Sequence, residues 1–170
     1  MSQFCNITEL YSLKVTVAAA ICGTMGWRRA ALYVPMQIVG GLTVTVFSHL
    51  MFYHEIPRLV AISEVTRSGG NHFVELLGTF ILILAILMLV QRRSKKISIV
   101  VGLLVGGQLI ATSSTMFANP QVTLARMFTY SAAGVKPIDG IVFILMQVIG
   151  TVLAVLVYRT VYRTRFLNNP

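Results

Sequence analysis

Four long stretches of the chain contain no Asp, Glu, Lys or Arg, and short polar segments separate them. A membrane-spanning helix needs about 20 mostly apolar residues, with a lower limit of roughly 17. Three of the stretches reach this length directly. The remaining one, residues 76–90, reaches it only if residues 73–75 are included, which places Glu75 at membrane depth. The pattern therefore predicts four spans, at residues 30–53, 73–90, 97–117 and 140–158.

Two shorter apolar segments, residues 15–25 and 120–133, are typical of re-entrant or interfacial half helices. Asn119 and Pro120 stand where the second would begin, because Asn is a favoured N-cap and Pro a favoured first helical residue. At the bilayer midplane the partial positive charge of this helix start would repel cations, while the Asn amide could hydrogen-bond a neutral solute. An ordinary Asn-Pro turn outside the membrane is the competing interpretation, which the flanking spans disfavour.

Two parts of the chain resemble each other. The tetrapeptide at residues 15–18 recurs at 122–125, and the pentapeptide at 36–40 recurs at 146–150, with three extra residues in the second copy. Each copy ends in a full-length span. If the four spans alternate in direction, the spans that end the two copies cross the membrane in opposite directions. An inverted repeat of this kind is typical of channels and transporters whose functional site lies near the midplane.

The placement of the positive charges predicts how the spans are oriented. The chain carries a formal net charge of +9, although only 11% of its residues are charged and 56% are hydrophobic. Most of the cations precede the first span, follow the second or follow the last, so alternating spans bring them to one side. This positive-inside bias makes the carboxy-terminal tail, residues 163–170, cytoplasmic. It also argues against a nucleic-acid-binding patch, so no nucleic-acid partner is expected.

The residue types needed for catalysis or metal binding do not cluster in the sequence. Cys5 and Cys22 lack metal or redox spacing and are interpreted as unpaired thiols. The three histidines fall near span ends, also without metal spacing. Of the five acidic residues only Glu75 lies at membrane depth. The sequence therefore predicts no enzyme, no catalytic residue, no metal and no cofactor.

Three segments resemble the major intrinsic protein family, the aquaporins and glycerol facilitators, in its bacterial form. Residues 117–126 are similar to the family's second Asn-Pro-Ala box, which here reads Asn119, Pro120, Gln121. Residues 75–79 are similar to the Glu-x-x-x-Thr that starts the family's fourth helix, and residues 27–40 resemble the start of its third helix. The resemblance implies that Glu75 supports the re-entrant loop by accepting backbone hydrogen bonds. A snorkelling interfacial residue is the alternative for Glu75.

The resemblance covers about residues 11–162 and implies an all-α membrane protein with a partial aquaporin-like fold. This fold would contain four transmembrane helices and one or two re-entrant half helices. The membrane domain would cover residues 15–162, after an N-terminal segment at residues 1–14. The implied function is a channel for small neutral solutes such as water, glycerol or metalloid hydroxides. The expected setting is the lipid bilayer of the inner (plasma) membrane, with a homotetramer as the family's usual assembly.

The chain also departs from the family pattern of six spans and two boxes. The first two spans are missing, and Ser12, Leu13 and Lys14 stand where the first box is expected. A lysine at the midplane is costly and would obstruct a neutral solute. One interpretation is a truncated channel that does not conduct by itself, and another is that a partner supplies the missing helices. The alternative function is a non-conducting structural or assembly protein that packs with partner helices.

The family's selectivity positions differ as well. Val122 occupies the place of the arginine that follows the box, and Gly107 occupies a fifth-helix position where water-selective members carry histidine and glycerol-conducting members carry glycine. Together they imply a wide, apolar constriction for solutes larger than water. Arg126 lies one turn beyond Val122 on the same helix face, so it either replaces the lost arginine or snorkels to the headgroups. Gln121 puts a bulkier amide where the family has alanine.

Overall fold

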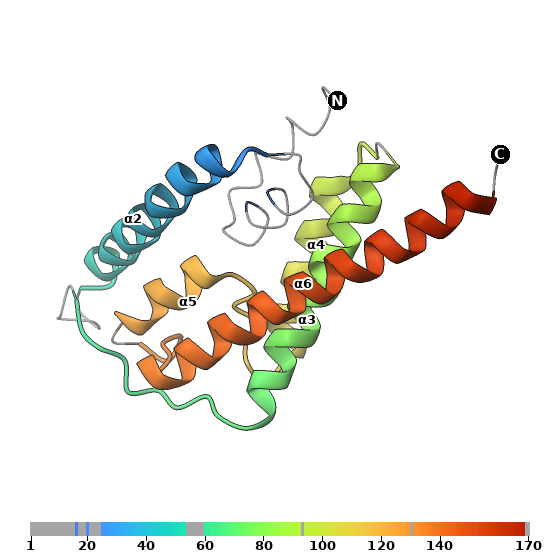
Figure 1. Ribbon diagram of the computed structural model, residues 1–170. Helices are drawn as coiled ribbons and strands as arrows, with labels where there is room; N and C mark the ends of the chain where they lie inside the picture. The colour runs from blue at the N-terminus through green and yellow to red at the C-terminus, as the bar shows by residue number, and fades with distance from the viewer. Residues whose placement is uncertain are drawn as a thin grey trace.

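The computed structural model describes Thr16, Ala20 and residues 25–53, 60–92, 94–129 and 131–168, with side chains described as far as Val161. The described residues form helices and connecting loops, without a strand. The helices are α2 (Trp27–Met51), α3 (Gly70–Gln91), α4 (Ile97–Ala111), α5 (Pro120–Met127) and α6 (Pro137–Asn168) (Figure 1). The expected segment at 1–14, with Ser12, Leu13 and Lys14, and most of the half helix at 15–25 lie outside the described residues.

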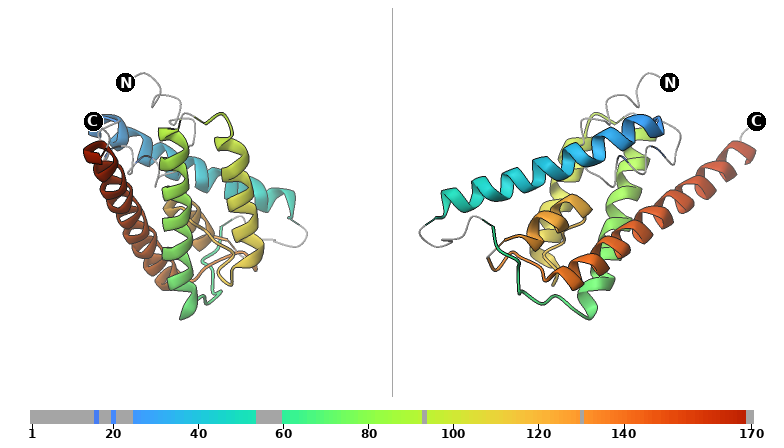
Figure 2. Two further views of the ribbon diagram at one scale, coloured as in Figure 1. Left: turned by 90° about the vertical axis from the view of Figure 1, so that its right-hand side faces the viewer. Right: turned by 60° about the vertical axis from the view of Figure 1, so that its left-hand side comes forward.

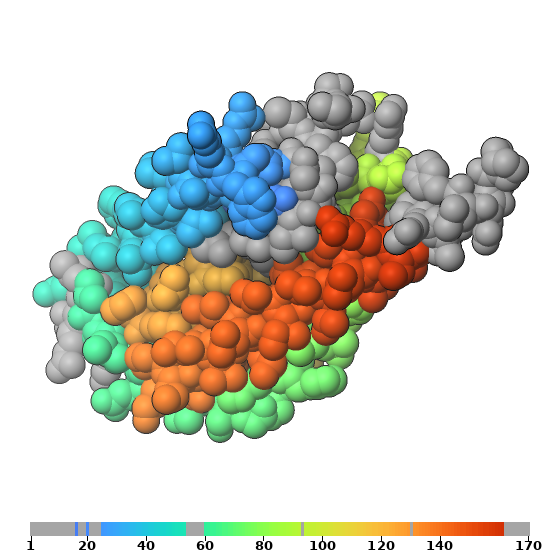
Figure 3. Space-filling view, in the orientation of Figure 1, coloured from blue at the N-terminus to red at the C-terminus, as the bar shows by residue number. Residues whose placement is uncertain are grey.

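The helices form two groups: α3, α4 and α6 make up one, and α2 and α5 make up the other. The two groups meet where α5 contacts α6. The helix α3 packs along α6, and α4 packs on α3, so that α3 stands between α6 and α4 (Figure 2). The short helix α5 lies between α2 and α6, and Figure 3 shows it flanked by both on one face of the molecule. This arrangement leaves α5, which begins at the Asn-Pro pair, in contact with both groups.

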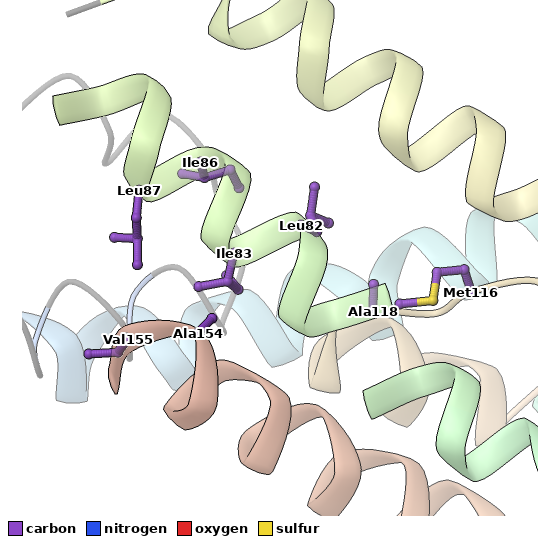
Figure 4. Close-up of a cluster of buried hydrophobic side chains, with 8 residues drawn as sticks. All are labelled: Leu82, Ile83, Ile86, Leu87, Met116, Ala118, Ala154 and Val155. Atoms are coloured by element: carbon purple, nitrogen blue, oxygen red, sulfur yellow. The ribbon is translucent and has the colours of Figure 1, made fainter. Parts of the chain in front are cut away.

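A hydrophobic core holds α3 against α6. Leu82, Ile83, Ile86 and Leu87 recur at helical spacing on one face of α3 and meet Ala154 and Val155 of α6 (Figure 4). Met116 and Ala118, from the loop before α5, complete the same cluster. The loop is therefore anchored to the α3–α6 pair by apolar packing.

Three helices, α2, α3 and α6, are long and apolar enough to cross a membrane, whereas α4 has only 15 residues. At about 1.5 Å per residue α4 is roughly 22 Å long, short of a hydrocarbon core of about 30 Å. The helix α4 ends at Ala111 instead of continuing to residue 117 as predicted, because Thr112 already has extended backbone angles. Thr115, Met116 and Ala118 all have positive φ angles, which an α-helix does not contain.

The helix α5 is also shorter than the half helix predicted at 120–133. From Met127 onward the backbone bonds to the segment that precedes α3, through Ser63 N–H to Met127 O (2.9 Å) and Ala61 N–H to Phe128 O (3.4 Å). These bonds use backbone groups that a longer helix would have kept within itself. The helix α6 begins three residues earlier than the predicted span, with Pro137 at its first position and Asp139 in its first turn, both favourable at a helix start.

The two copies of the sequence repeat make the same hydrogen bond. Thr16 Oγ1 accepts from Gln37 Nε2 at 3.3 Å in the first copy, and Thr123 Oγ1 accepts from Gln147 Nε2 at 3.0 Å in the second. Thr16 and Thr123 align in the repeat, as do Gln37 and Gln147. The similarity between the copies therefore extends from sequence to a buried polar contact.

Close approach of α3 and α6 depends on Gly150. A Cβ at this position would lie 2.5 Å from Leu76 O and 3.2 Å from Phe80 N, both backbone atoms of α3. Small residues allow membrane helices to approach in this way.

We expect Gly150→Ala to lower the free energy of unfolding by about 1–3 kcal/mol, because two backbones must separate to admit the methyl group. The matched control is Gly106→Ala on α4, where an added Cβ meets nothing within 4 Å. Thermal unfolding in detergent should show a Tm several degrees lower for the first variant only. Equal Tm values for the two variants would contradict the role given to Gly150.

Candidate pore region

The helix α5 begins at Asn119 through a capping hydrogen bond. Asn119 has extended backbone angles, and its Oδ1 accepts a hydrogen bond from Gln121 N–H at 3.2 Å. Pro120 is the first helical residue, where its missing N–H leaves no intrahelical bond unmade. Asn119 O accepts from Thr123 N–H at 2.9 Å, which closes the first turn. The predicted half-helix start is thus the observed start of α5.

Glu75 is fully buried on α3, and each of its carboxylate oxygens accepts two hydrogen bonds. Oε1 accepts from Phe117 N–H and from Ser114 Oγ, both at 2.8 Å. Oε2 accepts from Ala118 N–H at 2.9 Å and from Gln147 Nε2 at 2.8 Å. These donors belong to the loop before α5 and to α6, so one carboxylate joins three parts of the fold.

The loop held by Glu75 has an unusual backbone. The positive φ angles of Thr115, Met116 and Ala118 each cost about 1–2 kcal/mol for residues that carry a Cβ. This conformation turns the N–H groups of Phe117 and Ala118 toward α3, where the carboxylate accepts them. Hydrogen bonds to a buried charge contribute roughly 1.5–3 kcal/mol each, enough to offset the strain.

Gln147 extends this network from α6 to α5. Its side chain is fully buried, and its Nε2 donates both to Glu75 Oε2 and to Thr123 Oγ1. The Thr123 hydroxyl in turn reaches Asn119 O at 3.1 Å. The position of α5 relative to α3 and α6 is therefore fixed by polar contacts as well as by packing.

Two arginines contact the ring of Phe117, the residue whose N–H bonds to Glu75. The Cζ atom of Arg126 lies 4.3 Å from the ring centroid and that of Arg67 lies 5.3 Å from it, both within cation–π range. Phe143 of α6 packs edge-on against the same ring at 5.3 Å. Phe117 is thus held by aromatic and cationic contacts, and Arg126 additionally donates to Thr115 Oγ1 at 3.3 Å.

Arg67 joins the segment before α3 to the two loops that flank α5. Its guanidinium donates to Gly134 O at 2.9 Å, Ala132 O at 2.9 Å and Ser114 O at 3.2 Å. Its own N–H donates to Asp139 Oδ2 at 2.8 Å. Burial lowers the pKa of Arg67, and the negative charge of Glu75 opposes that shift. Since arginine titrates far above neutrality, Arg67 remains charged and keeps its three acceptors.

A cavity of about 430 Å³ lies between α2 and α5, beside the Asn-Pro start. Gln121, Val122 and Arg126 line it together with residues of α2, whereas Gly107 is exposed on α4 and does not line it. The Gln121 side chain packs close to Gly41 of α2, where an added Cβ would lie 2.9 Å from Gln121 Cγ. The structure therefore brings Gln121 of the box together with Val122 and Arg126 at one cavity, whereas Asn119, Pro120 and Gly107 do not line it.

Sequence reasoning did not single out Ser114, Gln147 or Arg67 as site residues. The sequence does mark Gln147, because it belongs to the repeat and lies in an apolar span, where a side-chain amide needs a hydrogen-bond partner. Arg67 and Ser114 lie in loops, and no periodicity or motif marks them. Their roles follow from contacts between distant positions: Arg67 and Ser114 are 47 residues apart, and Ser114 and Glu75 are 39 residues apart.

We expect Glu75→Gln to lower the free energy of unfolding by about 3 kcal/mol, because an amide offers one acceptor oxygen and an NH₂ group to a site with four donors. Less monodisperse protein should be recovered by size-exclusion chromatography, with a lower Tm. Glu64→Gln is the matched control, since Glu64 is exposed in the segment before α3. Unchanged recovery and Tm for Glu75→Gln would show that the four hydrogen bonds do not hold the loop.

Comparison with known proteins gives the context for this geometry. The sequence profile of the major intrinsic protein family matches residues 14–118. The aquaglyceroporin AqpS of Rhizobium meliloti (strain 1021) is 32% identical over 145 residues, which make up 85% of this chain and 61% of that protein. The chain thus spans less than two thirds of the length of this relative. No solved structure gives a significant match.

The family profile covers α2, α3 and α4 and ends one residue before Asn119, at which α5 begins. These elements make the chain a multi-pass, all-α membrane protein with a partial aquaporin-like fold. With more than half of its residues matched by the family profile, the chain belongs to the major intrinsic protein family.

Proposed function

We propose that this chain forms part of a channel for small neutral solutes, with the Asn119–Gln121 box at its narrow region. The supporting observation is the cavity beside α5, whose wall combines the box residue Gln121, the apolar Val122 and Arg126. A neutral solute can exchange hydrogen bonds there without losing the solvation that an ion would lose. The similarity to an aquaglyceroporin supports the same function.

The proposed solutes are larger than water, with glycerol or metalloid hydroxides as the leading classes. Val122 contributes a smaller and uncharged side chain than an arginine would, so the cavity at this point is wider and less polar. Arg126 lines the same cavity one helical turn away, and its positive charge would oppose cations. We further propose a plasma-membrane location with a cytoplasmic carboxy terminus, from the distribution of Lys and Arg.

A non-conducting assembly protein is the second candidate, because apolar side chains cover the outer faces of α2 and α4. None of the α4 residues is buried, and most of the apolar window of α2 is exposed. Lipid or further helices must cover these faces in a bilayer. The exposed residues include Leu32, Met36, Val39 and Phe47 of α2 and Ile99, Leu103, Leu109 and Ile110 of α4.

Proteoliposomes distinguish the two candidates. A channel should raise the rate of glycerol entry, followed by light scattering after an osmotic step, above that of protein-free liposomes, without raising Na⁺ leak. An assembly protein would leave both rates at the protein-free level, and that result would overturn solute conduction by this chain.

In conducting vesicles we expect Val122→Arg to lower glycerol permeability roughly tenfold, a barrier increase of about 1.4 kcal/mol. The longer side chain would narrow the cavity, and its charge would lie one turn from Arg126. Val122→Ile is the control, because it adds one methylene without charge and should change permeability far less. Similar permeabilities for the two variants would show that solutes do not pass Val122.

A further inference from the structure

One end of the molecule carries a dense group of cations. The starts of α2 and α4 and the end of α3 all lie at this end (Figure 1, Figure 2). Four of the five residues from Arg92 to Lys96, which connect α3 to α4, are Arg or Lys. Arg28 and Arg29 stand in the first turn of α2. We term the exposed cations Arg28, Arg29, Arg92, Lys95 and Lys96 the basic end.

The acidic residues that the structure describes do not neutralise the basic end. Glu64 precedes α3, Asp139 lies in the first turn of α6, and Glu75 is fully buried near the start of α3. At about 1.5 Å per residue the 22 residues of α3 span roughly 33 Å, several times the Debye length of about 8 Å at physiological ionic strength. Within the described part of the chain, no cation of the basic end forms a salt bridge. Its charge is therefore available to a partner outside the chain.

Apolar side chains place the basic end at the depth of lipid headgroups. Trp27, the single tryptophan of the chain, precedes Arg28 and is 66% exposed. Tryptophan is enriched where a membrane meets water. Ile99, three residues after Lys96, is 64% exposed on α4. Such side chains contact acyl chains, while the neighbouring Lys and Arg side chains extend to the headgroups.

A headgroup with a net negative charge fits the basic end better than a zwitterionic one. Clusters of about four to eight Lys or Arg residues beside a membrane helix are typical of surfaces that bind anionic lipids. A zwitterionic headgroup carries its own cation next to the phosphate, and that cation is repelled by the cluster. A soluble anion has no acyl chain to contact Trp27 or Ile99. The charge and the apolar neighbours together thus favour an anionic phospholipid.

We propose that the basic end binds the headgroups of anionic phospholipids and enriches these lipids around it above their share of the bilayer. This interaction goes beyond the proposed channel function, and it holds whether or not the chain conducts solutes.

Trp27 allows the enrichment to be measured at the basic end itself. Full-length protein is reconstituted into phosphatidylcholine vesicles that contain a phospholipid brominated near its headgroup, because bromine quenches the fluorescence of a nearby tryptophan. At equal mole fraction, brominated phosphatidylglycerol should quench Trp27 as if it were about threefold more concentrated than brominated phosphatidylcholine. This preference should decrease at about 1 M salt, where the Debye length falls to about 3 Å. Equal quenching by the two lipids would overturn the proposal.

Variants test whether the cations cause the preference. Arg28→Gln combined with Arg29→Gln should remove most of it, and Arg28→Lys combined with Arg29→Lys should retain it, because the charge is kept. The matched control is Lys136→Gln, since Lys136 is exposed at the start of α6 and its structural hydrogen bonds come from its backbone. A preference that survives both glutamine substitutions, or that Lys136→Gln reduces equally, would refute the role of the cations.

Moving the tryptophan tests where the lipids gather and does not depend on removing any charge. In protein with Trp27→Phe, Ile99→Trp reports on the connection between α3 and α4 and should show the same preference. Ile138→Trp is the matched reporter, because Ile138 is 67% exposed in the first turn of α6, away from the basic end. Equal preference at the two positions would show that anionic lipids are not drawn to the basic end.

Inorganic phosphate distinguishes a lipid headgroup from a soluble anion. At matched ionic strength, phosphate and chloride should reduce the preference for brominated phosphatidylglycerol equally, because both act only by screening. A much larger reduction by phosphate would indicate a site for a soluble anion and would overturn the assignment to lipid.

Discussion

The fold depends on one buried carboxylate. Glu75 lies in a helix that contains no other Asp, Glu, Lys or Arg, where an unpaired buried charge would cost several kcal/mol. Its two oxygens accept four hydrogen bonds, from two backbone N–H groups, a serine and a glutamine. The charge therefore determines where the loop before α5 and the face of α6 must lie, because any other arrangement leaves it without partners. Apolar packing alone, which lacks direction, would allow these segments to slide.

The loop geometry follows from this requirement. Phe117 and Ala118 can present their N–H groups to Glu75 only if the backbone leaves helical angles, so α4 ends at Ala111 and α5 restarts at Pro120. Met116 and Ala118 then pack into the α3–α6 core, and Arg67 binds the carbonyl of Ser114, whose hydroxyl donates to Glu75. The opposite charges of Arg67 and Glu75 thus hold the same short loop from two sides.

The strained loop places α5 where its residues face a cavity. Val122 and Arg126, one turn apart, line the same wall, and His49 of α2 contacts Thr129 beyond the end of α5. The wall of this cavity is built by α2 and α5, which meet where Gln121 packs closely on Gly41, while the bond from Gln147 to Thr123 joins α5 to α6. The short helix α5 is held in place because it is bonded at its start, along its side and beyond its end.

The sequence by itself determined the membrane class, the start of α5 and the equivalence of the two repeat copies. These features depend on local composition, on the capping preferences of Asn and Pro, and on spacing along one chain. It also pointed to Glu75, because a lone acid in an apolar helix requires partners. Only the tertiary structure decided which partners those are, where α4 and α5 end, that Arg126 faces a cavity and that Gly107 does not. These outcomes depend on backbone groups with no sequence signature and on residues brought together from distant positions, such as His49 and Thr129, which are 80 residues apart.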